Sequence, residues 1–161
     1  MRLTIRANLA MRILMQAAVN APGVIRAADV ALACNASVNH VSQVVSRLAL
    51  AGYLHTQRGR GGGIVLAQAP GEVRVGAVLR LIEAEVPLAE CMSLEDNTCP
   101  LTAACRLRGA LCRALDAFYA ALDEVSLEHL VAGNADLAGL LADDRPAPGG
   151  QRVPLGGARP A

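Results

Sequence analysis

The sequence contains no lysine, no tryptophan and few aromatic residues of any kind. All 15 of its basic residues are arginines, and its aromatic residues are Tyr53, Phe118 and Tyr119. A hydrophobic core in this chain must therefore be built from leucine, valine, isoleucine, alanine and methionine. The 161 residues are 53% hydrophobic, which is ample for one domain, or for one domain with a helical extension.

The sequence also lacks a segment that could serve as a secretion signal or a membrane span. Its first sixteen residues are amphipathic and are interrupted by Arg6, Asn8 and Arg12, whereas both kinds of segment need an unbroken apolar run. We therefore expect a cytoplasmic protein with no membrane contact, in which structural disulfides do not form. The chain shows no phosphate-binding nucleotide loop, carboxylate pair or nucleophile–base arrangement, so an enzyme is not expected.

Charge is divided unevenly along the chain, although the net charge is only +1. Residues 1–80 carry nine arginines against Asp29 and Glu72, while residues 81–161 carry six arginines against twelve acids. No carboxylate occurs over about forty residues, from Val30 to Gly71. An ordinary solvated surface mixes both signs, so this pattern favours a polyanion as partner. We interpret the first half as a nucleic-acid-binding module and the second as a regulatory or oligomerisation module.

Three helices are predicted in the basic half from the periodicity of apolar residues, over residues 3–19, 25–33 and 38–50. A three-residue turn beginning at Cys34 joins the second helix to the third, and Ser37 is suited to cap the third. Two short helices joined in this way form a helix-turn-helix. The residues expected to face the core are Ile5, Leu9, Ile13, Val19, Ile25, Val30, Leu32, Val38, Val41, Val44, Val45 and Leu48.

Two strands are predicted next, over residues 53–58 and 64–67, joined by a glycine-rich tip. A strand pair with glycine and arginine at its tip is typical of the wing of a winged helix, where arginines reach phosphates or a narrow minor groove. Amides and an arginine on the third helix can bond base edges in the major groove, although an ordinary solvated helix face would look similar. The predicted DNA contacts are Ser37, Asn39, His40, Gln43, Arg47, Arg58 and Arg60.

The second half is predicted to be helical on both sides of a cysteine-containing loop. Residues 75–84 form a fourth helix, which Pro87 ends. Residues 100–125 form a long helix of about 37 Å, whose apolar stripe suits dimerisation. Residues 127–131 form a short helix, and the proline- and glycine-rich residues 143–161 are expected to be a disordered tail.

The predicted fold is mostly α with a small β-wing: a winged helix-turn-helix followed by a long C-terminal dimerisation helix. The expected divisions are a DNA-binding domain, a cysteine loop with the start of the dimer helix, the dimerisation and C-terminal helices, and the tail, at residues 1–84, 85–105, 106–142 and 143–161.

Four of the five cysteines fall between Cys91 and Cys112, and three follow the spacing Cys91-x7-Cys99-x5-Cys105. The first two lie in a polar loop, and Pro100 is expected to begin the long helix, which places Cys105 about one turn into it. Three thiolates could then converge on one metal centre. Thiolates are the usual ligands of iron–sulfur clusters, but structural zinc, redox thiols and inert thiols are alternatives. Zinc sites usually show two CxxC-like pairs, and neither such a pair nor a nearby histidine is present.

Four segments, taken in order, resemble the bacterial winged-helix repressors of the Rrf2 family over residues 1 to about 142. They are MRLT at the start, NHVSQVVSRLALAGYL around the third helix, RGRGGGIVLA in the wing and CPLTAACRLRGAL from the second cysteine onward. The resemblance implies a homodimer that binds a palindromic operator in double-stranded DNA. It also implies a [4Fe-4S] or [2Fe-2S] cluster on Cys91, Cys99 and Cys105, whose state sets the affinity for DNA.

Two sensor types of this family fit the residues. The nitric-oxide-sensing type resembles this chain in NLAMR and in the segment from the second cysteine onward, and it is the nearer of the two. The iron-responsive type is similar in the seven-residue gap between the first two cysteines and in an asparagine near Asn8. In the nitric-oxide-sensing type an aspartate at that place can complete the cluster from the partner subunit, which makes Asn8 a candidate fourth ligand or cluster neighbour.

The remaining residues of interest fit the cluster less well. The biogenesis-regulator type of the family has a histidine ligand near the place of Arg108, so this type resembles the chain less. Cys112 lies about 10 Å along the helix from Cys105, and Cys34 lies in the turn before the third helix, so neither is expected to be a ligand. The alternative of another class is a zinc- or thiol-containing DNA-binding protein without a cluster.

Overall fold

The computed structural model describes residues 3–59, 61–93 and 97–142. In these residues the chain forms seven α-helices, one 3-10 helix and one two-stranded antiparallel sheet. The elements in order are α1 Ile5–Val19, α2 Ala27–Ala33, α3 Val38–Leu50, β1 Leu54–Gln57, β2 Gly63–Leu66, α4 Val75–Glu83, η1 Glu90–Met92, α5 Arg106–Asp123, α6 Leu127–Val131 and α7 Ala135–Leu141. The predicted fold class, mostly helical with a small β-wing, is confirmed.

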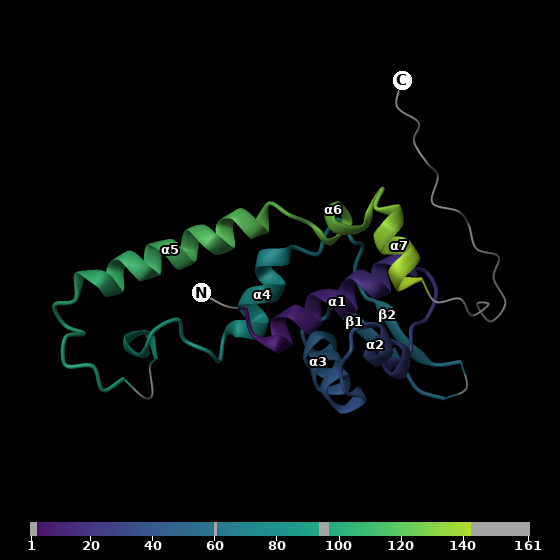
Figure 1. The fold of residues 1–161 in the computed structure, drawn as a ribbon, viewed down its shortest axis with the longest axis horizontal. Helices are drawn as coiled ribbons and strands as arrows, with labels where there is room; N and C mark the ends of the chain where they lie inside the picture. Colours follow the sequence, from purple (N-terminus) through teal and green to yellow (C-terminus); the bar gives the residue numbers. More distant parts are fainter. Residues whose placement is uncertain (1–2, 60, 94–96, 143–161) are drawn as a thin grey trace, which may run out of the picture.

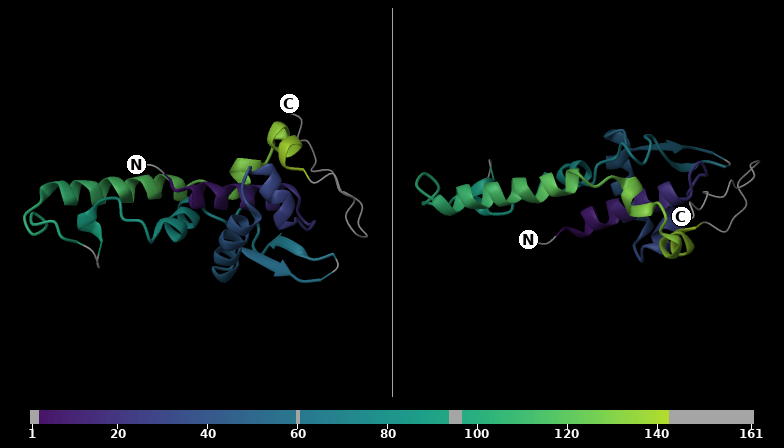
Figure 2. Two further views of the ribbon diagram at one scale, coloured as in Figure 1. Left: turned by 60° about the horizontal axis from the view of Figure 1, so that its bottom comes forward. Right: turned by 90° about the horizontal axis from the view of Figure 1, so that it is seen from above.

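The molecule has two parts that α4 connects (Figure 1). Helices α1 to α3 and the β1–β2 hairpin pack together on one side, while α5 and the loop between α4 and α5 extend away from them (Figures 1 and 2). Helices α6 and α7 then bring the chain back to α1. The loop that carries Cys91 and Cys99 therefore lies at the opposite end of the molecule from the wing.

The core of the compact part is built around α1, which packs against α3, α4 and α6. Ile13 and Leu14 of α1 are fully buried in one cluster with Leu48 of α3, Val78 of α4 and Leu127 of α6. These side chains are aliphatic, as the scarcity of aromatic residues requires. Burying side chains of this size contributes about 1.5–3 kcal/mol each, so the packing onto α1 holds the other helices in place.

Three residues that the periodicity placed in the core are exposed instead. Ile5 is 77% exposed because it is the first residue of α1 and borders an open hollow rather than another helix. Leu32 is 86% exposed because, at 3.6 residues per turn, it lies about 200° around α2 from the buried Val30. Val38, the first residue of α3, is 49% exposed. The other predicted core residues are buried, apart from Val19, which is half-buried.

The wing is the β1–β2 hairpin, in which Leu54 pairs with Leu66. Its strands lie within one residue of their predicted limits. Gly59 and Gly61 have φ angles of 97° and 82°, a region that side chains with a Cβ rarely adopt, so these glycines allow the chain to reverse. Arg60, which was predicted to lie at the tip of the wing, is outside the described residues.

Helix α4 packs closely against the end of α5. A Cβ atom at Gly76 would stand 2.6 Å from the backbone oxygen of Tyr119 and would also overlap the carboxylate of Asp123. Beside this contact, Arg80 donates a hydrogen bond from Nη1 to Asp123 Oδ1 at 2.9 Å, which lowers the pKa of Asp123. The Arg80 guanidinium also lies 4.9 Å from the centroid of the Tyr119 ring. These contacts set the direction in which α5 projects from the compact part.

Helix α5 is shorter than the sequence predicts, and this expectation was wrong. The helix begins at Arg106, with Cys105 as its N-cap, rather than at Pro100. The intervening residues form turns in which Thr102 Oγ1 donates to the carbonyl oxygen of Cys99 at 2.8 Å, a local bond that competes with the first helical turn. The 18 residues of α5 span about 27 Å. Cys105 therefore stands at the start of the helix and not one turn into it.

Two short helices return the chain to the compact part. Ser126 caps α6, because its Oγ accepts a hydrogen bond from the N–H of His129 while His129 Nδ1 accepts one from the N–H of Ser126. The sequence did not predict α7, which Asn134 caps by accepting from the N–H of Leu137 at 3.1 Å. The predicted tail, residues 143–161, lies outside the described residues. None of the described helices has both the length and the apolar character that a membrane span requires.

The α4–α5 contact predicts the effect of adding one methyl group. Gly76→Ala should lower the free energy of unfolding by about 1–3 kcal/mol, because the new Cβ meets the Tyr119 backbone and the Asp123 carboxylate. Thermal unfolding followed by circular dichroism measures the change. The control is Gly139→Ala in α7, where no atom lies within 4 Å of an added Cβ and where alanine favours the helix by up to about 1 kcal/mol. Equal melting temperatures for Gly76→Ala and the parent protein would contradict this packing.

Candidate nucleic-acid interface and metal centre

Helix α3 has one face in the core and one polar face that is open to solvent. Asn39 and Gln43 are exposed on the polar face, and His40 is half-buried near them. The Oγ of Ser37 caps the helix by accepting a hydrogen bond from the N–H of His40 at 3.2 Å. The two amide side chains can therefore form paired hydrogen bonds with the edge of an adenine base.

Helix α3 and the wing project from the same side of the compact part (Figure 2, left). Arg58, the residue that follows β1, is exposed. The acid-free stretch from Val30 to Gly71 contains both elements, so neither element carries a carboxylate that would compete with a nucleic acid. Arg60, which was predicted to act with Arg58, lies outside the described residues.

Arg47 was also predicted to contact DNA, but its guanidinium is engaged inside the protein. Its Nη1 donates to Glu85 Oε1 at 2.7 Å, and its Nη2 donates to the carbonyl oxygen of Leu81 at 2.7 Å. Arg47 therefore ties α3 to the end of α4 instead of presenting an unpaired cation. Sequence reasoning missed the role of Glu85, since an acid near the end of a predicted helix looks like any solvated residue.

Asn8 lies in a hollow of about 500 Å³ between the start of α1 and the turn before α3. Arg12, Cys34 and His40 line the same hollow, and Arg12 Nη1 donates to the carbonyl oxygen of Cys34 at 3.2 Å. None of the lining residues belongs to the cysteine loop. The structure therefore does not bring Asn8 together with the three candidate ligands of its own chain.

The loop between α4 and α5 is held by polar contacts rather than by a core. Glu90 accepts a hydrogen bond from the backbone N–H of Thr98 at 3.0 Å and another from the Thr98 hydroxyl, and these two bonds lower the pKa of Glu90. Arg108 on α5 donates from Nε to the carbonyl oxygen of Cys91 at 2.9 Å. The first part of the loop is thus bound to its second part and to α5. Sequence reasoning missed both contacts, because the bonded residues are 8 and 17 positions apart.

Cys91, Cys99 and Cys105 are half-buried free thiols in this loop and at the first turn of α5. Within the described residues, no three His, Cys, Asp or Glu side chains lie close enough to hold one metal ion. The structure therefore places the three thiols in one segment without gathering them at one point. Their chemistry fits an iron–sulfur cluster, because a set of donors made only of thiolates is the usual one for such clusters.

The other two cysteines lie apart from this segment or further along α5. Cys34 is buried in the main core, and this burial raises the pKa of its thiol above the ordinary value, although Arg12 opposes the shift. A neutral buried thiol is a poor metal ligand. Cys112 is half-buried in the middle of α5, about 10 Å along the helix from Cys105.

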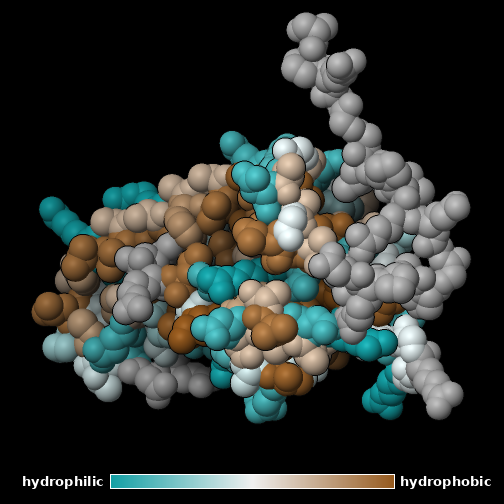
Figure 3. Space-filling view, turned by 45° about the vertical axis from the view of Figure 1, so that its right-hand side comes forward, coloured by the Kyte–Doolittle hydropathy of each residue, from teal (hydrophilic) through white to brown (hydrophobic). Residues whose placement is uncertain are grey.

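Helix α5 leaves much of its apolar surface uncovered. None of its residues is buried, and Leu107 is 64% exposed. Leu101, in the turn that precedes the helix, is 66% exposed. Apolar surface gathers on the α5 side of the molecule, at the left of Figure 3. A contiguous apolar surface on a helix is typical of an interface with another chain.

Comparisons with known proteins converge on one group of regulators. A family model named Rrf2 and described as an iron-dependent transcriptional regulator matches residues 3–133. The HTH-type transcriptional regulator NsrR of Geobacillus kaustophilus is 44% identical over 117 residues, which are 73% of this chain and 80% of that protein. The HTH-type transcriptional repressor NsrR of Streptomyces coelicolor is 40% identical over 149 residues, which are 91% of this chain and 99% of that protein.

The fold is also found in a solved structure. CymR, the global cysteine regulator of B. subtilis, superposes with a TM-score of 0.63 at 27% sequence identity. The match covers 82% of this chain and 97% of that chain, so it includes the α5 region as well as the compact part.

The exposed arginine of the wing predicts a change in the salt dependence of DNA binding. Arg58→Ala should weaken binding to all sequences alike, and it should reduce the slope of log affinity against log salt by about 0.9, the value of one lost phosphate contact. Fluorescence anisotropy with labelled duplexes at several salt concentrations measures the slope. Arg113→Ala, which removes an exposed arginine of α5, is the control and should leave the slope unchanged. If both variants keep the parent slope, the wing arginine does not contact phosphate.

Proposed function

The chain belongs to the Rrf2 family of transcriptional regulators, and we propose that it is a repressor whose operator binding is controlled by an iron–sulfur cluster that senses nitric oxide. As in its relatives, its activity is DNA-binding regulation of transcription and not catalysis. The observation that carries the proposal is the set of three thiols, Cys91, Cys99 and Cys105, in one hydrogen-bonded segment at the start of α5.

The DNA-binding part of the proposal rests on the side of the molecule where α3 and the wing project together. Asn39 and Gln43 would read base edges in the major groove, with Ser37 and His40 at the start of the same helix, while Arg58 and Arg60 would contact the backbone or the minor groove. We do not assign Arg47 to the DNA, because Glu85 and the Leu81 carbonyl hold its guanidinium. The protein would act in the bacterial cytoplasm, where its operator lies.

We also propose a homodimer, which the expected palindromic operator and the exposed surface of α5 both support. Two recognition helices can enter successive major grooves only if a dimer holds them about 34 Å apart. The uncovered apolar surface of α5, including Leu107, supports this helix as the contact between two copies. The acidic character of residues 81–161 also keeps this part of the chain away from DNA, which suits an interface role.

The cluster would be held by the thiolates of Cys91, Cys99 and Cys105. When bound, it supplies iron atoms that react with nitric oxide. Glu90 bonds to Thr98, and Arg108 of α5 bonds to the carbonyl oxygen of Cys91, so the chain beside Cys91 and Cys99 is held near the start of α5. Asn8 of the partner subunit is our candidate for the cluster neighbour, because its hollow is open at the start of α1.

A second candidate signal is iron itself. The seven-residue gap between Cys91 and Cys99 and the amide of Asn8, where the nitric-oxide-sensing type can have a carboxylate, favour this reading. An amide oxygen is a weaker iron ligand than a carboxylate, so a cluster completed by Asn8 would be lost more readily when iron is scarce. The family description as iron-dependent agrees with this candidate.

Substitution of a single cysteine tests the cluster. Cys99→Ala should abolish the visible absorbance of the anaerobically prepared protein and its bound iron and sulfide, and should leave a folded dimer whose operator binding no longer responds to nitric oxide or to an iron chelator. Cys112→Ala is the matched control and should retain the absorbance and the response. A colourless parent protein with bound zinc would reject the cluster, and a Cys99→Ala protein that still responds would reject its role as the sensor.

Titration of the same preparation with nitric oxide and with an iron chelator distinguishes the two candidate signals. Absorbance and operator binding that are both lost on titration with stoichiometric nitric oxide identify the nitric-oxide sensor. Absorbance that survives low nitric oxide but is lost to a chelator, together with operator binding, identifies the iron-responsive regulator.

Charge placed on the apolar surface of α5 tests the dimer. Leu107→Glu should raise the dissociation constant of the dimer at least tenfold, because two carboxylates would be buried without partners in a symmetric interface. Analytical ultracentrifugation over a range of concentrations measures the constant. Leu140→Glu introduces the same charge at an exposed leucine of α7 and should leave the dimer intact. A Leu107→Glu protein that dimerises like its parent would exclude this face of α5 from the interface.

A further inference from the structure

The segment that leads from α4 into the cysteine loop carries a carboxylate that contacts the recognition helix. Glu85 lies two residues beyond the end of α4 and six residues before Cys91. Its Oε1 accepts a hydrogen bond from Arg47 Nη1 of α3 at 2.7 Å, and its Oε2 lies 3.7 Å from Arg6 Nη1 of α1. One side chain at the entrance of the loop thus joins two helices of the DNA-binding part.

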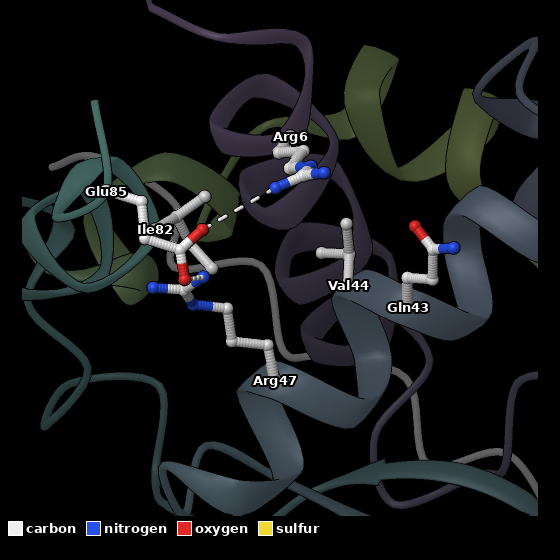
Figure 4. A pocket seen from close by; sticks show the side chains of 6 residues that line it. All are labelled: Arg6, Gln43, Val44, Arg47, Ile82 and Glu85. Atoms are coloured by element: carbon white, nitrogen blue, oxygen red, sulfur yellow. Dashed lines mark hydrogen bonds and ion pairs between the residues drawn. The ribbon is translucent and has the colours of Figure 1, made fainter.

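Figure 4 shows the Glu85 carboxylate between the guanidiniums of Arg6 and Arg47, with Ile82, Val44 and Gln43 around them. These residues line a hollow of about 230 Å³. Gln43 belongs to the polar face of α3 and stands one turn before Arg47 on the same helix. A displacement of Glu85 would therefore act on α3 within one turn of a predicted base-reading residue.

Two further contacts show that the end of α4 is held on the side of the compact part. Arg47 Nη2 donates to the carbonyl oxygen of Leu81 at 2.7 Å. Glu83 Oε1 accepts from the backbone N–H of Thr4 at 2.7 Å and from its hydroxyl at 2.9 Å. The end of α4 is therefore bonded to the start of α1 and to the third turn of α3, and it cannot shift without changing these bonds.

The segment between the end of α4 and the cysteine loop is bound to α5 at its other end, at Cys91. The carbonyl oxygen of Cys91 accepts a hydrogen bond from Arg108 Nε at 2.9 Å. Between this bond and the Arg47–Glu85 pair, the chain runs through residues 86–90, which contain no buried side chain. A rearrangement that gathers the cysteine side chains would pull on Glu85 through this short stretch.

The Glu85 contacts are weak enough to break and form again. The side chain of Glu85 is 61% exposed and that of Arg47 is 30% exposed, and ion pairs at such positions contribute little to stability because water competes for both partners. The Glu85 contacts can therefore change without unfolding the domain, whereas the buried contacts of α1 and α3 cannot.

We propose that Glu85 is a positioning residue that transmits the state of the cysteine loop to the recognition helix through Arg47. The proposal rests on the function proposed above and names the route within one chain by which the loop controls DNA binding. In the structure the Glu85 carboxylate contacts Arg6 and Arg47 and not a predicted cluster ligand. It acts by setting the position of α3 relative to the end of α4.

The test compares operator affinity of the cluster-loaded and the cluster-free dimer in the parent protein, Glu85→Gln, Glu85→Asp and Glu124→Gln. Glutamine keeps the shape of Glu85 and removes its charge, while aspartate keeps a carboxylate. Glu124 is an exposed acid that makes no ion pair within the described residues, and its variant controls for the change in net charge. The ratio of the two affinities is the quantity of interest, because a purely structural defect weakens both forms alike and leaves the ratio unchanged.

Glu85→Gln should reduce this ratio at least fivefold toward one, as expected when a coupling of typical size is lost. Glu85→Asp and Glu124→Gln should keep the ratio within twofold of the parent value. A ratio for Glu85→Gln within twofold of the parent value would overturn the proposal. If the parent protein itself binds operator equally in both forms, the proposed function fails instead, so the two failures are distinct.

A second readout does not involve DNA. Amide hydrogen exchange of the loaded and the unloaded dimer should differ both at the start of α5 and in the last turns of α3 in the parent protein. In Glu85→Gln the difference at α5 should persist while the difference at α3 disappears. A difference at α3 that persists in Glu85→Gln would show that the signal reaches α3 by another route, and would overturn the proposal.

Discussion

Helix α4 packs against α1 on one side and against the end of α5 on the other, and the relation between the two parts of the molecule depends on this double contact. Its buried face, with Val78, Leu79 and Ile82, belongs to the core of the compact part. On the side of α5, Gly76 permits a close approach that a side chain would prevent. Because α5 carries Cys105 at its first turn and α1 packs on α3, α4 stands between the candidate sensor and the recognition helix.

The uneven distribution of charge along the chain has two consequences in the structure: α3 and the wing carry no acid, and ion pairs join the two halves of the chain. The acid-free stretch forms the side where α3 and the wing project, as a DNA-binding surface requires. Part of the remaining asymmetry is internal, because arginines of the first half pair with acids of the second. Arg6 and Arg47 meet Glu85, and Arg80 meets Asp123. Opposite charges in the two halves therefore help to join them.

In the cysteine loop the backbone is restrained by hydrogen bonds, but the three thiols are not brought together at one point. Glu90 and Arg108 hold its two parts close to α5, yet the described residues contain no preformed group of metal-binding side chains. Under the proposed function, the thiols would come together only when the metal centre binds, so that binding and rearrangement of the loop would be one event. Loss of the centre would then change the structure around it, as a sensor requires.

The local pattern of the sequence determined most of the secondary structure. The limits of α3, the Ser126 cap of α6 and the hairpin with its glycine-rich tip follow from side-chain periodicity and from backbone preferences within a few residues. The same pattern placed Cys91 and Cys99 in one loop and predicted the polar face of α3. It was wrong about the start of α5, where a hydrogen bond from Thr102 to Cys99 competes with helix formation after Pro100.

The tertiary structure alone decided which charged residues have partners and which apolar residues are covered. Arg47 and Asn39 lie on the same predicted helix face, but only Arg47 is reached by Glu85, 38 residues away in the chain. Ile5 and Leu9 share a periodicity, but only Leu9 is buried. Contacts between distant residues depend on how helices pack in three dimensions, and a pattern of neighbours along the chain does not contain that information.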